Sequence, residues 1–193
     1  MVATTVHEAV LLEESMLALE VKPDGRYVDG TLGGGTHTRT LLERSAPTGQ
    51  ILSLDVDLQA LERARSELEG YGTRFRAVER NFRFLDQVVA EEAFSPCDGV
   101  LLDLGFSSDE LLDPKKGLSF LQDGVLDMRL GLQSNDDGLT AADIVNSWSK
   151  EEIGTLLQEY GEERFAWRIA EAIVKARKSA RIIGTFDLVS VIT

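Results

Sequence analysis

Residues 27–37 read YVDGTLGGGTH, and residues 51–55 read ILSLD. A short β-rich run ends in the acid Asp29 and opens into glycines, and a second apolar run ends in the acid Asp55. A doubly wound α/β domain holds a nucleoside cofactor with this arrangement, because the glycines let the backbone approach the ligand and the second acid accepts the ribose hydroxyls. An ordinary glycine-rich turn is the alternative, but the position of Asp55 favours a nucleoside site.

The composition predicts a soluble cytoplasmic protein. At 193 residues the chain is long enough for one domain with a sizeable core and a little more. No apolar run approaches the roughly 20 residues that span a bilayer, and the first 14 residues do not resemble a signal peptide. The single cysteine, Cys97, forbids an internal disulfide and fits a reducing compartment. The histidines, His7 and His37, are far apart and there is no cysteine pair, so we expect no metal site.

The charge balance limits the interaction with nucleic acid. The chain has 33 acidic and 20 basic residues, a formal net charge of −13, which argues against broad electrostatic capture of nucleic acid. Residues 74–83 contain four arginines, and residues 175–181 contain two lysines and two arginines. Either run could form a local basic patch, although a solvated face is the favoured interpretation of each run alone.

Strands and helices alternate along the first half of the chain. The pattern predicts strands over residues 26–29, 51–55, 75–78 and 99–103, and helices over residues 10–19, 38–44, 84–93 and from an Asp57 N-cap onward. The last strand is an apolar run of the kind that is buried on both faces. This order predicts a parallel sheet with right-handed crossovers.

The alternation breaks after Asp103. Residues 105–138 are polar, rich in Gly and Asp, and expected to be irregular, and loops of this length are usually functional. Helices are then predicted over residues 140–147, 150–160 and 162–178, and Thr185 is expected to be the N-cap of a last helix. Because the sheet has four strands and the last helix meets the chain end, we expect a fragment or a chain truncated at its C-terminus.

Five motifs occur in one order: HEAVLL at residues 7–12, DGTLG at 29–33, DLGFSS at 103–108, GVLDMR at 124–129 and YGEERFA at 160–166. Together they resemble the ribosomal RNA small-subunit methyltransferase H (MraW) family over essentially the whole chain. The last two motifs are not general methyltransferase features, so they identify the family rather than the fold. Members of this family use S-adenosylmethionine (SAM) to methylate the exocyclic N4 of a cytosine in the decoding region of 16S rRNA.

The resemblance implies a Rossmann-like class I SAM-dependent methyltransferase fold, with an incomplete parallel sheet and a helical insertion domain. Residues 1–112 would form the first half of the SAM-binding domain, and residues 113–193 a loop and an incomplete insertion. Family chains are longer, and the part absent here completes the far side of the sheet. We therefore expect that SAM binding survives and that methylation is weak or lost. The implied partner is 16S rRNA in the small ribosomal subunit, and a homodimer is left open.

The resemblance also assigns site residues. Its cofactor contacts carry over to Gly33, Gly35, Thr36, His37, Asp55, Phe82, Asp103 and Glu110. The glycine-loop residues would lie along the methionine end, Asp55 would take the ribose, and Phe82 would lie near the adenine. Two positions depart from the family: Thr36 replaces a glycine and adds a Cβ close to the ligand, and Glu110 replaces an amide near the cofactor.

The catalytic assignments are Asp103, Ser107 and Ser108. Cytosine N4 is a poor nucleophile because its lone pair is delocalised into the ring, so a hydrogen-bond acceptor must turn the amine toward the methyl group. Asp103 would do this beside the cofactor, while Ser107 and Ser108 would shape the base pocket. No strong base is needed, since the product loses its proton afterwards. The target base must be unstacked or already unpaired.

Two other functions stay open. A nicotinamide-dependent oxidoreductase shares the glycines and the acid of strand two, but the run at residues 33–38 lacks the third glycine of Gly-x-Gly-x-x-Gly. A non-catalytic remnant would keep only the binding of small-subunit RNA, through the arginines of residues 74–83. In the polar loop, Asp127 and Arg129 are either a plain ion pair or residues that order the loop over the substrate.

Overall fold

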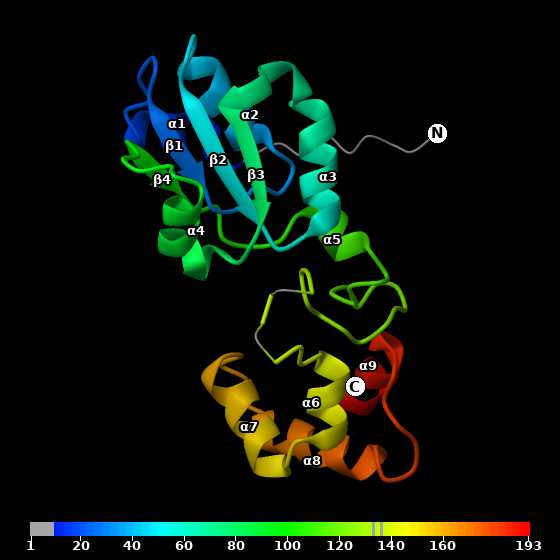
Figure 1. The fold of residues 1–193 in the computed structure, drawn as a ribbon. Coiled ribbons are helices and arrows are strands. Elements are labelled where there is room, and N and C mark those ends of the chain that lie inside the picture. The colour runs from blue at the N-terminus through cyan, green and yellow to red at the C-terminus, as the bar shows by residue number, and fades with distance from the viewer. Residues whose placement is uncertain (1–9, 133, 136) are drawn as a thin grey trace. The chain divides into compact units, whose positions relative to one another are not determined.

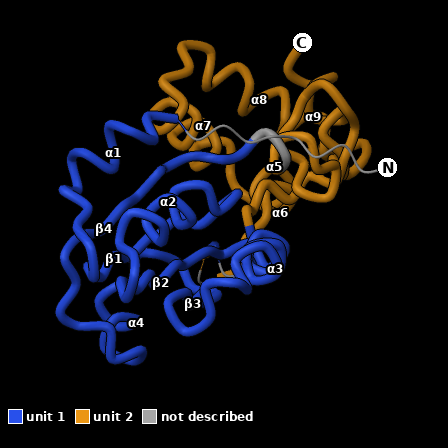
Figure 2. Tube along the Cα trace, turned by 90° about the horizontal axis from the view of Figure 1, so that it is seen from above, with its two compact units in different colours: residues 1–107, 131–134 blue, residues 108–130, 135–193 orange. Residues whose placement is uncertain are grey.

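The structure is a computed structural model that describes residues 10–132, 134–135 and 137–193. His7 lies outside the described residues. The chain divides into two compact units: unit 1 comprises residues 1–107 and 131–134, and unit 2 comprises residues 108–130 and 135–193 (Figure 2). The assignment of residues 1–112 to SAM binding and of 113–193 to an insertion stays a prediction. No helix in the described part of the chain has the length and apolar character needed to span a bilayer.

Unit 1 contains a four-stranded sheet in the order β3-β2-β1-β4 (Figure 1). Its strands are β1 (Arg26–Asp29), β2 (Gln50–Asp55), β3 (Phe75–Glu79) and β4 (Gly99–Leu101). All neighbours pair in parallel, with Asp29 in register with Ser53 and Leu101. The predicted parallel α/β sheet is therefore confirmed, and the carboxyl ends of its strands meet at one edge.

The helical segments of unit 1 are α1 (Leu12–Ala18), α2 (Thr36–Arg44), α3 (Leu58–Glu67), α4 (Leu85–Glu91) and the 3₁₀ segments η1 (Glu69–Arg74) and η2 (Phe82–Phe84). Asp57 caps α3 as expected, because its side chain accepts a hydrogen bond from the Gln59 amide. Side chains alternate between the two faces of a strand. Ile51 accordingly joins a core with helix residues such as Leu41, while Leu52 joins a second core with Val88.

The expected strand over residues 99–103 is shorter than predicted, and its burial was predicted wrongly. β4 ends at Leu101, and the side chains of Val100 and Leu102 are 42% and 45% exposed. The reason lies in the topology: β4 stands last in the strand order and pairs only with β1 among the described strands. The apolar run therefore predicted a strand here correctly, but only the face that carries Leu101 is buried, not both faces.

The arginine run of residues 74–83 is used inside the fold. The Arg74 guanidinium donates to the carbonyl oxygens of Gly49, at 2.8 Å, and of Leu42. Arg76 donates to the Glu92 carbonyl at 2.8 Å. These half-buried side chains tie β3 to neighbouring segments, which weakens the interpretation of the run as a single RNA-binding face.

Unit 2 is helical, with α5 (Ser108–Leu112), α6 (Ala141–Ser147), α7 (Lys150–Glu159), α8 (Ala166–Ala176) and α9 (Thr185–Ile192). α5 lies within residues 105–138, which were expected to be irregular throughout. Gly184, not Thr185, is the N-cap of α9, because the Asp187 carboxylate accepts the Ile183 and Gly184 amides. Buried side chains of this unit form one core: Leu126, Val145, Ile153, Ala170, Ile173 and Ile182.

Candidate functional site

Asp29, the acid that ends β1, is fully buried behind the glycine loop. One carboxylate oxygen accepts the Thr31 amide at 3.1 Å, and the other accepts the Thr38 hydroxyl at 2.7 Å. The Thr38 hydroxyl also lies 2.8 Å from the Ser53 hydroxyl on β2. Burial raises the pKa of Asp29 above its ordinary value, although these hydrogen bonds oppose the shift. Asp29 therefore anchors the loop internally and is not exposed to a ligand in solvent.

Asp55, the acid that ends β2, holds the glycine loop from the other side. One carboxylate oxygen accepts the Gly33 amide at 2.7 Å, and the other accepts the Asp57 amide at 2.9 Å. Asp55 is half-buried at the carboxyl end of β2, so its carboxylate lies at the edge of the sheet where open α/β sheets bind their ligands. The contact to Gly33 links the two sequence signals that predicted the site.

The glycines of the loop have distinct roles. Gly33 and Gly35 adopt φ values of +48° and +76°, in the left-handed region that favours glycine. Gly35 is the N-cap of α2, so Thr36 and His37 lie in the first turn of that helix. Gly30 packs closely against its neighbours: a Cβ there would lie 2.4 Å from a Leu102 methyl carbon. The chain thus brings its backbone close to the end of β4.

His37 and Asp103 face one another beside this loop. The imidazole is 6% exposed, and its Nδ1 lies 3.7 Å from an Asp103 carboxylate oxygen. Its buried Nε2 has no hydrogen-bond partner among the described residues. Buried polar atoms nearly always have a partner, so this nitrogen suits a polar atom of a ligand. The Asp103 side chain is 46% exposed, while its amide donates to the Thr31 hydroxyl at 2.7 Å.

The remaining candidates fall into two groups. Phe82 lies in η2, is 39% exposed, and has its Cβ 3.2 Å from the position that a Cβ on Gly30 would occupy. Ser107 is half-buried at the end of the first segment of unit 1. Ser108 and Glu110 belong to unit 2, where Glu110 forms an ion pair with Lys116 at 3.4 Å. Ser108 and Glu110 thus belong to a different unit from the other candidates, and their part in the site stays a prediction.

Sequence reasoning missed the hydroxyls of Thr31 and Thr38 and the amide of Asn81. Thr31 has a usable signal, since an aspartate that accepts the amide two residues on is a common turn motif. Asn81 has none: its side chain donates to the Ser134 carbonyl at 3.1 Å, across 53 residues. Such long-range contacts leave no trace in local spacing.

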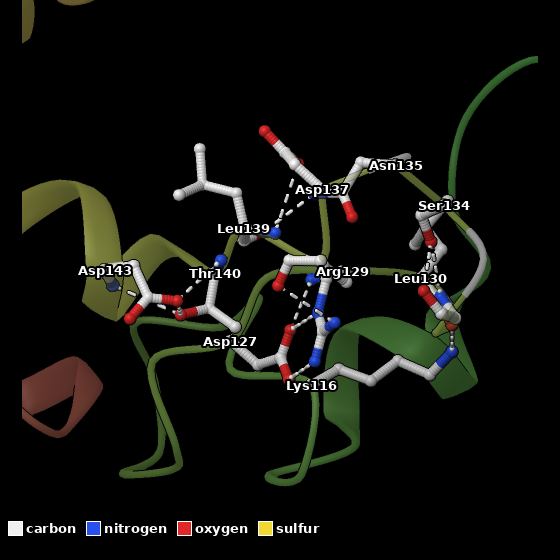
Figure 3. A network of polar contacts seen from close by, with 12 residues as sticks. Lys116, Asp127, Arg129, Leu130, Ser134, Asn135, Asp137, Leu139, Thr140 and Asp143 are labelled. Atoms are coloured by element: carbon white, nitrogen blue, oxygen red, sulfur yellow. Dashed lines mark hydrogen bonds and ion pairs between the residues drawn. The ribbon is translucent and has the colours of Figure 1, made fainter.

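Unit 2 contains a separate polar network around the Asp127–Arg129 ion pair (Figure 3). The Arg129 guanidinium meets both carboxylate oxygens, at 2.6 and 2.9 Å, and lowers the pKa of Asp127. It also donates to the Gly138 carbonyl at 3.2 Å, while Lys116 donates to the Leu130 carbonyl. The ion pair is confirmed, and its arginine also connects residue 129 to Gly138 within the loop; a role over the substrate stays a prediction.

Comparison with known proteins identifies relatives. The model of the MraW methylase family matches residues 4–193. The chain is 46% identical over 189 residues to "Ribosomal RNA small subunit methyltransferase H" of Thermomicrobium roseum, covering 98% of this chain and 57% of that protein. It is 45% identical over 186 residues to the protein of the same name from Geotalea daltonii, covering 96% and 59%. A solved SAM-dependent O-methyltransferase from Thermotoga maritima is 21% identical, with a TM-score of 0.39 over 48% of this chain and 34% of that one. The chain thus spans less than two thirds of the length of these curated relatives.

Proposed function

The chain belongs to the MraW methylase family, and from this premise we propose that it binds SAM and serves in methylation of the exocyclic N4 of a cytosine in 16S rRNA of the small ribosomal subunit. The names of the relatives support the rRNA substrate. The observation that carries the proposal is the meeting of the glycine loop, Asp55 and the His37–Asp103 pair at the carboxyl edge of the sheet. Open α/β sheets bind their ligands at this edge.

The residues present fit SAM. The unpartnered Nε2 of His37 and the backbone of Gly35 and Thr36 would hold the methionine part. The Asp55 carboxylate, at the end of β2, would accept hydrogen bonds from the two ribose hydroxyls, and the half-exposed ring of Phe82 suits the adenine. A contact from Glu110 to the cofactor stays a prediction, because Glu110 lies in unit 2.

The chemistry follows from these positions. Bound SAM supplies an electrophilic methyl group on a sulfonium. Asp103 presents a half-exposed carboxylate whose backbone is fixed by Thr31, so it can accept a hydrogen bond from the cytosine amine and orient it. Its negative charge also suits a neighbouring cationic cofactor. Ser107 and Ser108 would shape the base pocket, and the methylated amine releases its proton to water afterwards.

Titration calorimetry of SAM and of NAD into the chain tests this proposal, with Asp55→Ala and Asp98→Ala as variants. Asp98 is a matched control, because its carboxylate accepts the Arg26 amide at 2.8 Å at the opposite end of β1. We expect SAM to bind and NAD not to bind. Loss of two charge-assisted hydrogen bonds to the ribose, together worth about 3 kcal/mol, should weaken SAM about 100-fold in Asp55→Ala. Asp98→Ala should bind as the wild type does.

The other outcomes decide between the alternatives. Binding of NAD instead of SAM would indicate an oxidoreductase. A folded chain that binds neither ligand but binds small ribosomal subunits would indicate a non-catalytic RNA-binding protein. If SAM binds, transfer of its labelled methyl group to small subunits then tests the substrate, and we expect weaker turnover than that of a full-length relative.

A further inference from the structure

A turn from the middle of the polar loop packs in unit 1, apart from the loop residues on either side of it. Within this turn, the Ser134 amide donates to the Gly131 carbonyl at 3.1 Å. The Gly131 amide in return donates to the Ser134 hydroxyl at 2.7 Å. These hydrogen bonds join Gly131 and Ser134 to one another, so the two residues make their outward contacts as a pair.

The first outward contact is with the backbone that follows Asp55. A Cβ on Gly131 would lie 1.7 Å from the Val56 carbonyl oxygen and 3.2 Å from the Asp57 amide nitrogen. Only glycine fits at this distance, and the reason is the close approach of two backbones. The turn therefore lies directly against the end of β2, next to Asp55, the residue proposed to bind the ribose.

The second outward contact is with the segment that carries Phe82. The Asn81 side chain donates to the Ser134 carbonyl at 3.1 Å, and its oxygen accepts the Arg83 amide at 3.0 Å. Asn81 is thereby the N-cap of η2, the short segment that contains Phe82. One amide side chain thus connects the turn to the position of the proposed adenine contact.

We propose that this turn, between Gly131 and Ser134, is a wall of the nucleoside site that fixes the spacing between Asp55 and Phe82. The inference rests on the proposed function. Asp55 ends β2 and Phe82 follows β3. The turn contacts the residue next to each of them, Val56 and Asn81. A site whose walls are held in place before the ligand arrives loses less entropy on binding. Gly131 and Asn81 are accordingly positioning residues for the adenosine half of the cofactor.

A turn that only tethers the loop would contribute to stability but not to the binding of the nucleoside. The test must therefore measure the nucleoside half of SAM separately from its amino-acid half. SAM and 5′-methylthioadenosine share the nucleoside but differ in the amino-acid part. We expect Gly131→Ala and Asn81→Asp to weaken both ligands by the same factor, about tenfold. Asn81→Asp keeps an acceptor for the Arg83 amide and places a carboxylate against the Ser134 carbonyl, so it breaks the turn contact while preserving the cap.

Two control variants complete the calorimetric experiment. Gly70→Ala is the matched control for Gly131→Ala, because a Cβ on Gly70 meets nothing within 4 Å; it should bind both ligands as the wild type does. His37→Ala, which removes the Nε2 proposed to hold the methionine part, should weaken SAM and leave the affinity for 5′-methylthioadenosine unchanged. Thermal unfolding of each variant shows whether it is folded. If Gly131→Ala does not fold, Asn81→Asp tests the proposal by itself.

The outcomes separate this inference from the proposed function. Suppose that Gly131→Ala and Asn81→Asp bind both ligands with wild-type affinity while Asp55→Ala loses affinity for SAM. This result would overturn the proposal about the turn and still support the proposed SAM site. Weakening of SAM without weakening of 5′-methylthioadenosine would also overturn the proposal about the turn. A wild-type chain that binds neither ligand would overturn both.

Discussion

Replacement of Asp29 by asparagine tests the physical account of the glycine loop. Asn keeps the shape of the side chain and removes its charge. Its oxygen can still accept the Thr31 amide, and its NH₂ group can donate to the Thr38 hydroxyl, which then donates to Ser53. Asp29→Asn therefore preserves every hydrogen bond of this buried network and isolates the cost of a buried carboxylate.

The sign of the pH dependence follows from the raised pKa of Asp29. The folded state holds the proton more tightly than the unfolded chain, whose Asp pKa is about 3.9. The free energy of unfolding of the wild type should therefore fall as pH rises from about 4 through the folded pKa. Each tenfold difference in proton affinity corresponds to about 1.4 kcal/mol. We expect Asp29→Asn to gain stability relative to the wild type between pH 4 and pH 7.5, and the size of the gain measures the difference in proton affinity between the folded and unfolded states.

Urea unfolding followed by circular dichroism at both pH values measures this difference. Asp29→Ala is the comparison, because it leaves the Thr31 amide and the Thr38 hydroxyl without their acceptor. The Thr38 hydroxyl can still pair with Ser53, but the Thr31 amide loses its partner, so this variant should be less stable by about 1–3 kcal/mol. An Asp29→Asn variant whose stability relative to the wild type is the same at both pH values would refute the reasoning, since the carboxylate would then carry no penalty for its charge.

Three further predictions concern packing and ion pairs. Gly154→Ala places a Cβ 2.5 Å from the Trp167 ring, so it should destabilise the packing of α7 on α8 by about 1–3 kcal/mol. The thermal unfolding midpoint should fall, and an unchanged midpoint would contradict this packing. Arg74→Met removes two hydrogen bonds to backbone carbonyls, so it should lower the free energy of unfolding in urea by about 2 kcal/mol. Its affinity for small-subunit RNA should stay unchanged. Weaker RNA binding at full stability would instead indicate a surface role. Arg129 lowers the pKa of Asp127, so the stabilisation from this pair should be present above about pH 4 and lost as pH falls through the folded pKa. Asp127→Asn should speed hydrogen exchange between residues 127 and 138 at pH 7, and its effect should shrink as pH falls below about 4. Equal exchange of variant and wild type at pH 7 would argue against the pair.

Local patterns predicted the elements of the fold well. The strand ending at Asp29 and the Asp57 cap of α3 are confirmed as expected. Apolar runs, turn glycines and capping side chains act over a few residues, and backbone sterics limit what those residues can form. The family resemblance is likewise confirmed, by the match over residues 4–193. The misplaced cap at Thr185 arose because a glycine can cap a helix when an acid three residues on accepts its amide.

The sequence by itself thus determined the parallel α/β sheet, the family and the acids at the strand ends. Only the tertiary structure decided which side chains meet. It placed His37 against Asp103, exposed one side of β4, and returned Gly131 to the end of β2. These contacts join residues far apart in the chain, and they depend on how the strands are ordered and packed rather than on local preference. Periodicity reports which face of an element is buried, but not what lies against it.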